Sequence, residues 1–172
     1  MTLNERIVIE KLKKKDYSTF ETFYYEYVGL VHYIISIYIK DANTIDDVTQ
    51  EVFMRIIEKI NLFDDYKASL KTWIATLTKN YTINYLKQNQ NKYQLDEGEV
   101  EKKSTTNTTE YQLQKQDLKS ILEPLEYQVL FLKIEENMKH KEISLVLNIS
   151  IDVSKKTYLK AIQKAKAYYS KK

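Results

Sequence analysis

Apolar residues recur at spacings of three and four along most of this chain, which is the pattern of amphipathic helices. The longest run covers residues 20–38, where Phe, Tyr, Val and Ile side chains line one broad face. A second helix is expected over 44–60, opened by a capping box of Thr44 and Asp47, and a third over 70–87. The N-terminal half is therefore predicted to be a helical bundle.

The periodicity returns from residue 118 to residue 169 in shorter segments. Pro124 favours the first turn of one helix, and residues 139–147 form a short amphipathic one. Asn148 follows, a residue that tolerates the left-handed conformation of a tight turn between helices. Asp152 is the expected N-cap of the last helix. This succession predicts a helix-turn-helix.

A polar stretch without sustained periodicity separates the two halves. It covers residues 89–116 and includes the run Ser104-Thr-Thr-Asn-Thr-Thr109. Such a composition is typical of a flexible linker. We therefore predict an all-α fold with two small helical domains, an N-terminal bundle over 1–88 and a C-terminal helix-turn-helix domain over 117–172.

The composition excludes several classes of protein. With 43% hydrophobic and 30% charged residues the chain is globular, and 2 Gly and 1 Pro disfavour a nucleotide-binding α/β fold. The 0 Cys exclude disulfides and thiolate metal sites, and the 2 His lie far apart, so we expect no metal and no cofactor. No apolar stretch approaches the ~20 residues of a membrane span, and the N-terminus is unlike a signal peptide. The protein is expected to be cytoplasmic.

Charge is distributed unevenly beneath the formal net value of +3. Residues 1–100 carry 13 basic and 15 acidic side chains, whereas residues 112–172 carry 12 and 7. The asymmetry suggests that the C-terminal part contacts a polyanion while the rest contacts something else.

The last helix has the pattern of a DNA-contacting element. No acidic residue follows Ser154, and lysines recur from Lys155 to the C-terminus. The N-terminal end of such a helix can enter the major groove while lysines contact phosphates. An ordinary helical hairpin with a solvated basic face is the alternative. We expect Thr157 and Tyr158 to be exposed, which favours a contact surface over a solvated hairpin.

The expected helix over 44–60 has a polar face with a different pattern. Asp47, Gln50, Glu51 and Met54 are neighbours on it at spacings of three and four. Asp47 and Glu51 are like charges one turn apart, which a basic partner surface would explain. A carboxylate pair tolerated in water is the alternative. Acid–base catalysis is not expected, since no metal ligand or polar pocket accompanies the pair.

Aromatic and basic residues gather between residues 66 and 87. Tyrosine rings provide stacking platforms for unpaired bases, and lysines can follow a nucleic-acid backbone. Trp73 lies on the apolar stripe, where such a residue is more often part of the core. With 15 Tyr in the chain, some clustering of tyrosine is expected by chance.

In order and spacing, these parts resemble a two-domain RNA polymerase sigma factor of the extracytoplasmic-function type, within the sigma-70 superfamily. The resemblance covers nearly the whole chain outside the linker. Three sets of residues carry it: Asp46-Asp-Val-Thr-Gln-Glu-Val-Phe-Met-Arg55; Phe63 with Lys71-Thr-Trp-Ile-Ala75 and Lys79-Asn80 through Asn84-Tyr-Leu-Lys87; and Leu122-Glu-Pro-Leu-Glu-Tyr-Gln-Val-Leu-Phe-Leu132 with Lys141-Glu-Ile-Ser144, Ser150 and Lys155.

The resemblance implies a transcription-initiation subunit without enzymatic activity. Its expected partners are core RNA polymerase, promoter DNA (duplex at −35 and melted at −10) and, for regulation, an anti-sigma protein. The implied polymerase-binding residues are Asp47, Gln50, Glu51 and Met54. The implied −10 contacts are Tyr66, Lys67, Lys79, Asn80 and Lys87, and the implied −35 contacts are Lys155, Lys156, Tyr158 and Lys160.

The chain departs from the family pattern at two places. Asn148 stands where the family usually has Gly, and the family's terminal Arg-Ala-Arg appears only as Lys160-Ala161-Ile162. Lysine lacks the planar fork that reads guanine bidentately, so −35 recognition is expected to depend more on shape, Tyr and Lys contacts. The competing hypotheses are a free-standing helix-turn-helix regulator and a helical interaction module without DNA binding.

Overall fold

The computed structural model describes residues 2–89 and 110–170. These residues form helices and turns without a strand, so the predicted all-α fold is confirmed for the described part of the chain. The chain divides into two compact units, Met1–Val100 and Glu101–Lys172. The division falls inside the segment predicted to be a linker, and each unit is described by itself.

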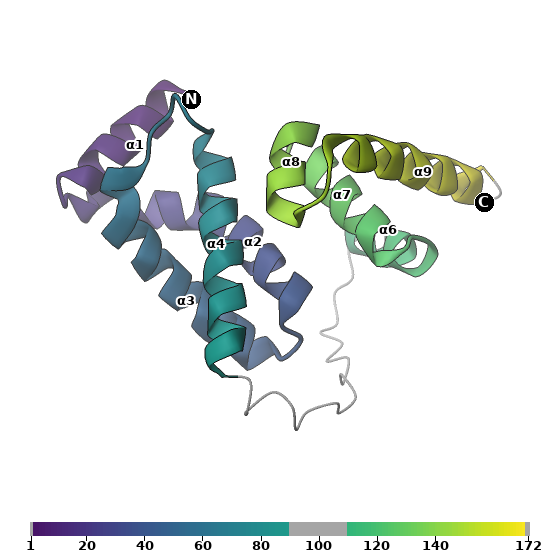
Figure 1. The fold of residues 1–172 in the computed structure, drawn as a ribbon, viewed down its shortest axis with the longest axis horizontal. Helices are drawn as coiled ribbons and strands as arrows, with labels where there is room; N and C mark the ends of the chain where they lie inside the picture. Colours follow the sequence, from purple (N-terminus) through teal and green to yellow (C-terminus); the bar gives the residue numbers. More distant parts are fainter. Residues whose placement is uncertain (1, 90–109, 171–172) are drawn as a thin grey trace. The chain divides into compact units, whose positions relative to one another are not determined.

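Unit 1 is a bundle built around α2. It contains α1 (Leu3–Lys13), the 3-10 helices η1 (Tyr17–Thr19) and η2 (Ile60–Leu62), α2 (Phe20–Tyr38), α3 (Ala42–Lys59) and α4 (Leu70–Gln88). The central helix α2 packs against both α3 and α4, while α1 contacts η1 and η2 (Figure 1). The apolar face predicted over 20–38 is thus the middle of the core.

The core of unit 1 combines aliphatic and aromatic side chains with buried threonines. Ile34 and Ile74 are fully buried, and the ring of Phe23 meets that of Phe53 edge-on at 6.2 Å. Thr78 and Thr82 are also fully buried, and each hydroxyl donates to the carbonyl four residues earlier in α4. Because these bonds satisfy the hydroxyls locally, α4 can place small polar residues in the core.

Helix α3 begins earlier than the sequence pattern predicted. Its N-cap is Asp41, whose carboxylate accepts a hydrogen bond from the Thr44 N–H at 2.7 Å, and the first helical residue is Ala42. The prediction of a capping box from Thr44 and Asp47 was wrong. Asp41 competes for the same N–H group, and a carboxylate one turn earlier lengthens the helix and suits its dipole.

Unit 2 contains α6 (Glu110–Ile121), α7 (Pro124–Ile134), α8 (His140–Leu147) and α9 (Ile151–Tyr169). Residues 90–109 of the predicted linker lie outside the described residues. Its last part is helical because α6 begins at Glu110, and the linker's bounds stay a prediction. Its sequence, Glu-Tyr-Gln-Leu-Gln-Lys-Gln, is rich in good helix formers but has few apolar residues. Pro124 stands in the first turn of α7 as expected.

The helix-turn-helix consists of α8 and α9, both of which pack against α7. Asn148 ends α8 in the left-handed conformation, with φ of 56°, as predicted. The N-cap of α9 is Ser150, whose hydroxyl accepts from the Val153 N–H at 3.1 Å, so the expectation for Asp152 was wrong. Asp152 instead lies in the first turn of α9, where its charge favours the helix dipole.

Candidate protein and nucleic-acid interfaces

The outward face of α3 carries all four residues predicted to contact a protein partner. Asp47, Gln50, Glu51 and Met54 are exposed, and Met54 leaves 66% of its surface open to solvent. The opposite face of the helix buries its aliphatic residues completely in unit 1: Val48, Val52 and Ile56. An exposed methionine among carboxylates and an amide is a mixed surface of the kind that interfaces use.

Glu51 also joins α3 to α4. Its carboxylate accepts a hydrogen bond from the Tyr81 hydroxyl on α4. Burial and the neighbouring Glu51 carboxylate raise the pKa of Tyr81 to about 12, so its hydroxyl stays protonated as the donor at neutral pH. Glu51 therefore orients one side of the α3 face and is not simply a solvated charge.

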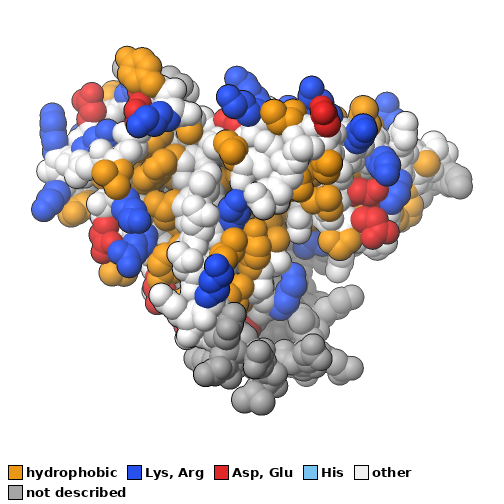
Figure 2. Space-filling model, in the orientation of Figure 1, with side chains coloured by type: hydrophobic (Ala, Val, Ile, Leu, Met, Phe, Trp, Pro, Cys, Tyr) orange, Lys and Arg blue, Asp and Glu red, His pale blue; other side chains and the backbone are white. Residues whose placement is uncertain are grey.

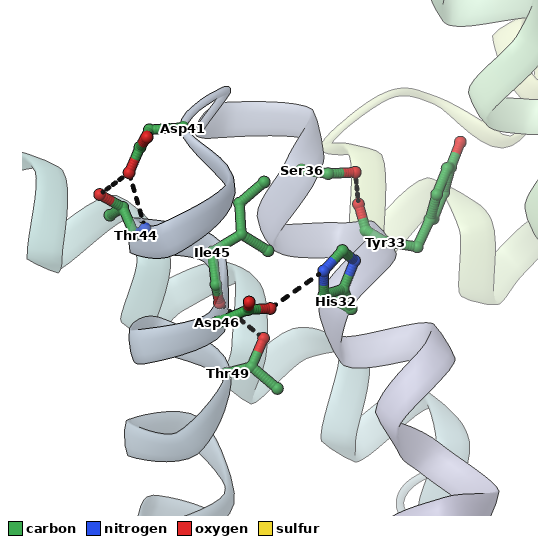
Figure 3. A network of polar contacts seen from close by, with 8 residues as sticks. All are labelled: His32, Tyr33, Ser36, Asp41, Thr44, Ile45, Asp46 and Thr49. Atoms are coloured by element: carbon green, nitrogen blue, oxygen red, sulfur yellow. Dashed lines mark hydrogen bonds and ion pairs between the residues drawn. The ribbon is translucent and has the colours of Figure 1, made fainter. Parts of the chain in front are cut away.

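Further polar contacts fix the N-terminal end of α3 (Figure 3). His32 Nε2 on α2 lies 3.5 Å from an Asp46 carboxylate oxygen on α3. The Thr49 hydroxyl donates to the Ile45 carbonyl at 2.7 Å, and the Asp41 cap closes the same end. The turns that carry Asp47 and Gln50 are thus anchored on α2 and by the cap.

An apolar groove of about 580 Å³ adjoins this face, and the sequence analysis did not predict it. Tyr17, Phe20 and Tyr24 line it from η1 and α2, opposite Gln50 and Met54 on α3. The Tyr24 ring packs against that of Phe53, with centroids 4.6 Å apart. The aromatic spacing 17, 20 and 24 is visible in the sequence, but its position beside α3 depends on the packing of two helices.

A second hollow of about 490 Å³ lies between α3 and α4. Of the predicted −10 residues, only Asn80 lines it. The other lining residues combine cations, rings and amides: Arg55, Lys59, Leu62, Trp73, Thr76, Leu77, Tyr81, Asn84 and Gln88. Rings, amides and cations together fit a nucleobase and its phosphate. Trp73 belongs both to this wall and to the core, since its ring meets Phe63 at 5.6 Å.

The other predicted −10 residues lie elsewhere on unit 1. Tyr66 and Lys67 are exposed in the loop before α4, with 98% of Tyr66 open to solvent. Lys87 is exposed in the last turn of α4, and Lys79 is half-buried, which lowers its pKa. On the face drawn in Figure 2, basic side chains are spread over both units, while acidic ones form a few small groups.

Along α9, Lys155, Lys156 and Lys160 are exposed as predicted, but Tyr158 and Thr157 are not. Tyr158 is half-buried, and its ring meets that of His140 on α8 edge-on at 5.6 Å. The expectation of an exposed ring was wrong because residue 158 follows the buried Ser154 by one helical turn and shares its face. Two exposed residues that the sequence analysis missed, Ile151 and Val153, lie at the start of α9.

His140 and Ser154 connect the two helices of the helix-turn-helix. His140 Nδ1 lies 2.9 Å from the Ser154 hydroxyl, and Ser154 is fully buried. Burial lowers the pKa of His140, and the nearby positive charges of Lys133 and Lys155 lower it further. The imidazole is therefore neutral at pH 7 and bonds as a neutral partner of the hydroxyl.

Comparison with known proteins supports the resemblance to a sigma factor. Residues 23–92, which cover most of α2 and all of α3 and α4, match the family model for sigma-70 region 2. The chain is also 24% identical over 160 residues to SigM of Bacillus subtilis (strain 168), an ECF RNA polymerase sigma factor, across 89% of this chain and 96% of that protein. These matches confirm the resemblance. The chain is similar to sigma factors of the sigma-70 family, of the extracytoplasmic-function type.

Two solved structures share the fold at low sequence identity. The sigma factor RpoE of Bartonella quintana, crystallised with the anti-sigma factor NepR, matches with a TM-score of 0.63 at 12% identity over 88% of this chain and 96% of that one. CnrH, in complex with the cytosolic domain of CnrY, matches with a TM-score of 0.57 at 17% identity over 96% of each chain. Within the described residues, no helix is long and apolar enough to cross a membrane.

Proposed function

We propose that this protein directs transcription initiation by binding core RNA polymerase through unit 1 and promoter DNA through both units. Polymerase supplies the chemistry, and the protein supplies promoter position and captures unpaired bases. It therefore acts as a non-enzymatic subunit in the cytoplasm. The observation that carries the proposal is the exposed face of α3 beside an apolar groove, which a free-standing DNA-binding regulator does not need.

The α3 face and its groove are proposed to bind the polymerase together. Asp47 and Glu51 offer negative charge to a basic partner, while Met54 and the aromatic wall offer apolar area. Charged groups guide association and fix orientation, whereas apolar residues at the centre of an interface contribute more of the affinity. An anti-sigma protein that covered this surface would exclude polymerase, which is how we expect such a partner to act.

The hollow between α3 and α4 is proposed to receive an unpaired base of the −10 element. Asn80 can bond to a base edge, the rings of Trp73 and Tyr81 offer apolar walls, and Lys59 can neutralise a phosphate. Tyr66, Lys67, Lys79 and Lys87 remain proposed contacts to the melted strand around it. Flipping a base costs a few kcal/mol, and stacking worth about 1–3 kcal/mol per base can offset that cost.

Helix α9 is proposed to enter the major groove of the −35 element. Lys155, Lys156 and Lys160 are exposed and would contact phosphates. Tyr158 remains a proposed contact only through the edge that its packing against His140 leaves open.

Run-off transcription with core polymerase on genomic fragments, with and without this protein, tests the proposal. We expect discrete transcripts that appear only when the protein is present. Binding to duplex DNA without any polymerase-dependent transcript would favour the free-standing regulator instead.

A further inference from the structure

The recognition helix begins with exposed aliphatic side chains. Ile151 and Val153 leave 40% and 41% of their surfaces open, in the first turn of α9. Scattered exposed aliphatic residues are ordinary on protein surfaces. These two are distinguished by their place, since they lie at the helix end that directly follows the turn of the helix-turn-helix.

The surroundings of this turn favour nucleic acid as its occupant. Lys155 and Lys156 are exposed in the next turn and Lys160 in the one after, and no acidic residue occurs between Ser154 and the end of α9. Such a surface complements the negative charge of a phosphate backbone and disfavours a basic partner. The one nearby carboxylate, Asp152, accepts hydrogen bonds and can face the amino groups of cytosine or adenine in a major groove.

Unit 2 also lacks the residue that most often reads guanine. The chain contains only two arginines, Arg6 and Arg55, and both lie in unit 1. Lysine can bond to guanine but lacks the planar fork that fixes a bidentate geometry. Base discrimination in unit 2 therefore needs another source, and the exposed aliphatic pair is available at the helix end that enters the groove.

We propose that Ile151 and Val153 recognise thymine methyl groups in the −35 element; this inference rests on the proposed function. The thymine C5-methyl group lies in the major groove, where an aliphatic side chain can cover it and exclude water. Positions 151 and 153 project from opposite sides of the helix, because an α-helix turns once in 3.6 residues. With the helix inserted by its N-terminal end, they face methyl groups on two different bases.

The start of α9 is held rigidly enough for this role. The Ser150 hydroxyl caps the Val153 N–H, and the buried Ser154 bonds to His140 on α8. The Tyr158 ring packs on the same histidine one turn later. Because the side chains are already held in place, binding loses less conformational entropy. A contact as small as one methyl group can then change the affinity measurably.

The test removes thymine methyl groups from the DNA without changing base pairing. The full-length protein selects duplexes from a randomised pool, and each thymine of the best duplex is then replaced in turn by uracil. We expect a loss of affinity of about fourfold for each contacted methyl, in keeping with the free energy of burying one methylene. Uracil in the flanking base pairs should have no effect.

Protein variants then assign the methyl contacts to residues. In the double variant Ile151→Ala with Val153→Ala, the uracil effect should disappear, as a double-mutant cycle requires of groups in contact. Ile134→Ala is the matched control. Ile134 is also an exposed aliphatic residue of unit 2, but it adjoins Tyr169 at the far end of α9. That variant should keep the full uracil effect.

Each other outcome overturns the inference in a distinguishable way. A selected duplex without thymine, or one indifferent to uracil, means that no methyl group is read. An equal uracil effect in the parent and the double variant means that other residues read the methyl groups. If no duplex is selected and no transcript forms with core polymerase, the proposed function fails along with this inference.

Discussion

Helices α3 and α9 are similar scaffolds with opposite surfaces. They contain 18 and 19 residues, and each buries one face in its own unit. The exposed face of α3 carries Asp47, Glu51 and Met54, whereas that of α9 carries lysines. Packing accounts for the buried faces alone. The exposed faces therefore indicate the partner of each helix. An acidic and apolar face, as on α3, suits a protein partner, and a basic face, as on α9, suits DNA.

The two units also stabilise their folds differently. Unit 1 buries an extended set of aliphatic and aromatic side chains around α2. Unit 2 has a smaller core and includes a buried carboxylate, Glu126, that pairs with Lys164 on α9 at 2.7 Å. Glu126 also accepts the Glu123 N–H, so it caps α7 while connecting it to α9. The basic helix is thus held to its unit partly by charge.

The largest effects are expected from substitutions in the core of each unit. Ile34 in unit 1 and Leu132 in unit 2 are both fully buried. Ile34→Ala and Leu132→Ala should each lower the free energy of unfolding by about 2–5 kcal/mol, because each leaves a cavity. Ile34→Ala should weaken polymerase binding more than duplex binding, and Leu132→Ala should do the reverse.

Urea unfolding can report on each unit separately. The single tryptophan, Trp73, lies in unit 1, so its fluorescence follows that unit while circular dichroism follows both. The account is contradicted if both variants shift the fluorescence transition equally or lose both binding activities equally. The two units would then not bind polymerase and duplex DNA separately.

The next effect tests the basic surface of α9. Lys155→Gln with Lys156→Gln should weaken duplex binding on the order of 10- to 100-fold and reduce the salt slope by about 2, one for each lost phosphate contact. Lys14→Gln with Lys15→Gln is the matched control, since this exposed pair in unit 1 has the same charge. Binding titrations at several salt concentrations measure both slopes. Equal slopes for the parent and the α9 variant would mean that these lysines are only solvated.

A smaller effect is expected in promoter opening. Asn80→Ala, in the hollow between α3 and α4, should reduce permanganate reactivity of the melted −10 strand, and Tyr66→Ala should reduce it if the loop supplies a stacking ring. Each lost stacking contact corresponds to about 1–3 kcal/mol. Tyr169→Ala, in the last turn of α9, should leave opening unchanged. Unaltered reactivity in both test variants would remove the −10 assignment.

The smallest effect concerns the pH dependence of unit 2. Burial raises the pKa of Glu126, but the Lys164 ammonium and the Glu123 N–H outweigh it and lower the pKa below its usual 4.5. The ionised Glu126 carboxylate therefore contributes its full stabilisation of unit 2 at pH values above its ordinary pKa. This stabilisation is lost as the pH falls through the lowered pKa of the folded state. Because Lys164 is partly exposed to solvent, we expect a contribution of only about 1 kcal/mol.

Glu126→Gln should remove this part of the acid sensitivity. Circular dichroism during urea unfolding, at pH values on either side of the carboxyl range, measures the difference between variant and parent. If both proteins lose the same stability on acidification, the ion pair does not stabilise unit 2.

The sequence predicted α2, α3, α4, α7, α8 and α9, because the buried residues of these helices recur with the helical period. It misplaced the starts of α3 and α9, because several residues near each start could serve as a cap and only backbone geometry selects Asp41 and Ser150. Tyr158 was misassigned for a related reason. A tyrosine fits either face of a helix, and its contact with His140 depends on how α8 crosses α9.

The candidate sites were predictable to different extents. The polar face of α3 lies within one helix, so periodicity alone brought Asp47 and Met54 together. The groove beside it and the hollow around Asn80 each join two helices, and their walls depend on interhelical packing. Periodicity within a single helix carries no information on that packing.

The central claim is that the α3 face binds core polymerase, and affinity for the core enzyme tests it most directly. Fluorescence anisotropy should show that Asp47→Ala with Met54→Ala binds core at least tenfold more weakly, while helix content and duplex binding stay unchanged. Tyr81→Phe, which removes only the hydroxyl bonded to Glu51, should bind nearly as well as the parent. Equal affinity of the double variant and the parent, or no binding by the parent, would contradict the account.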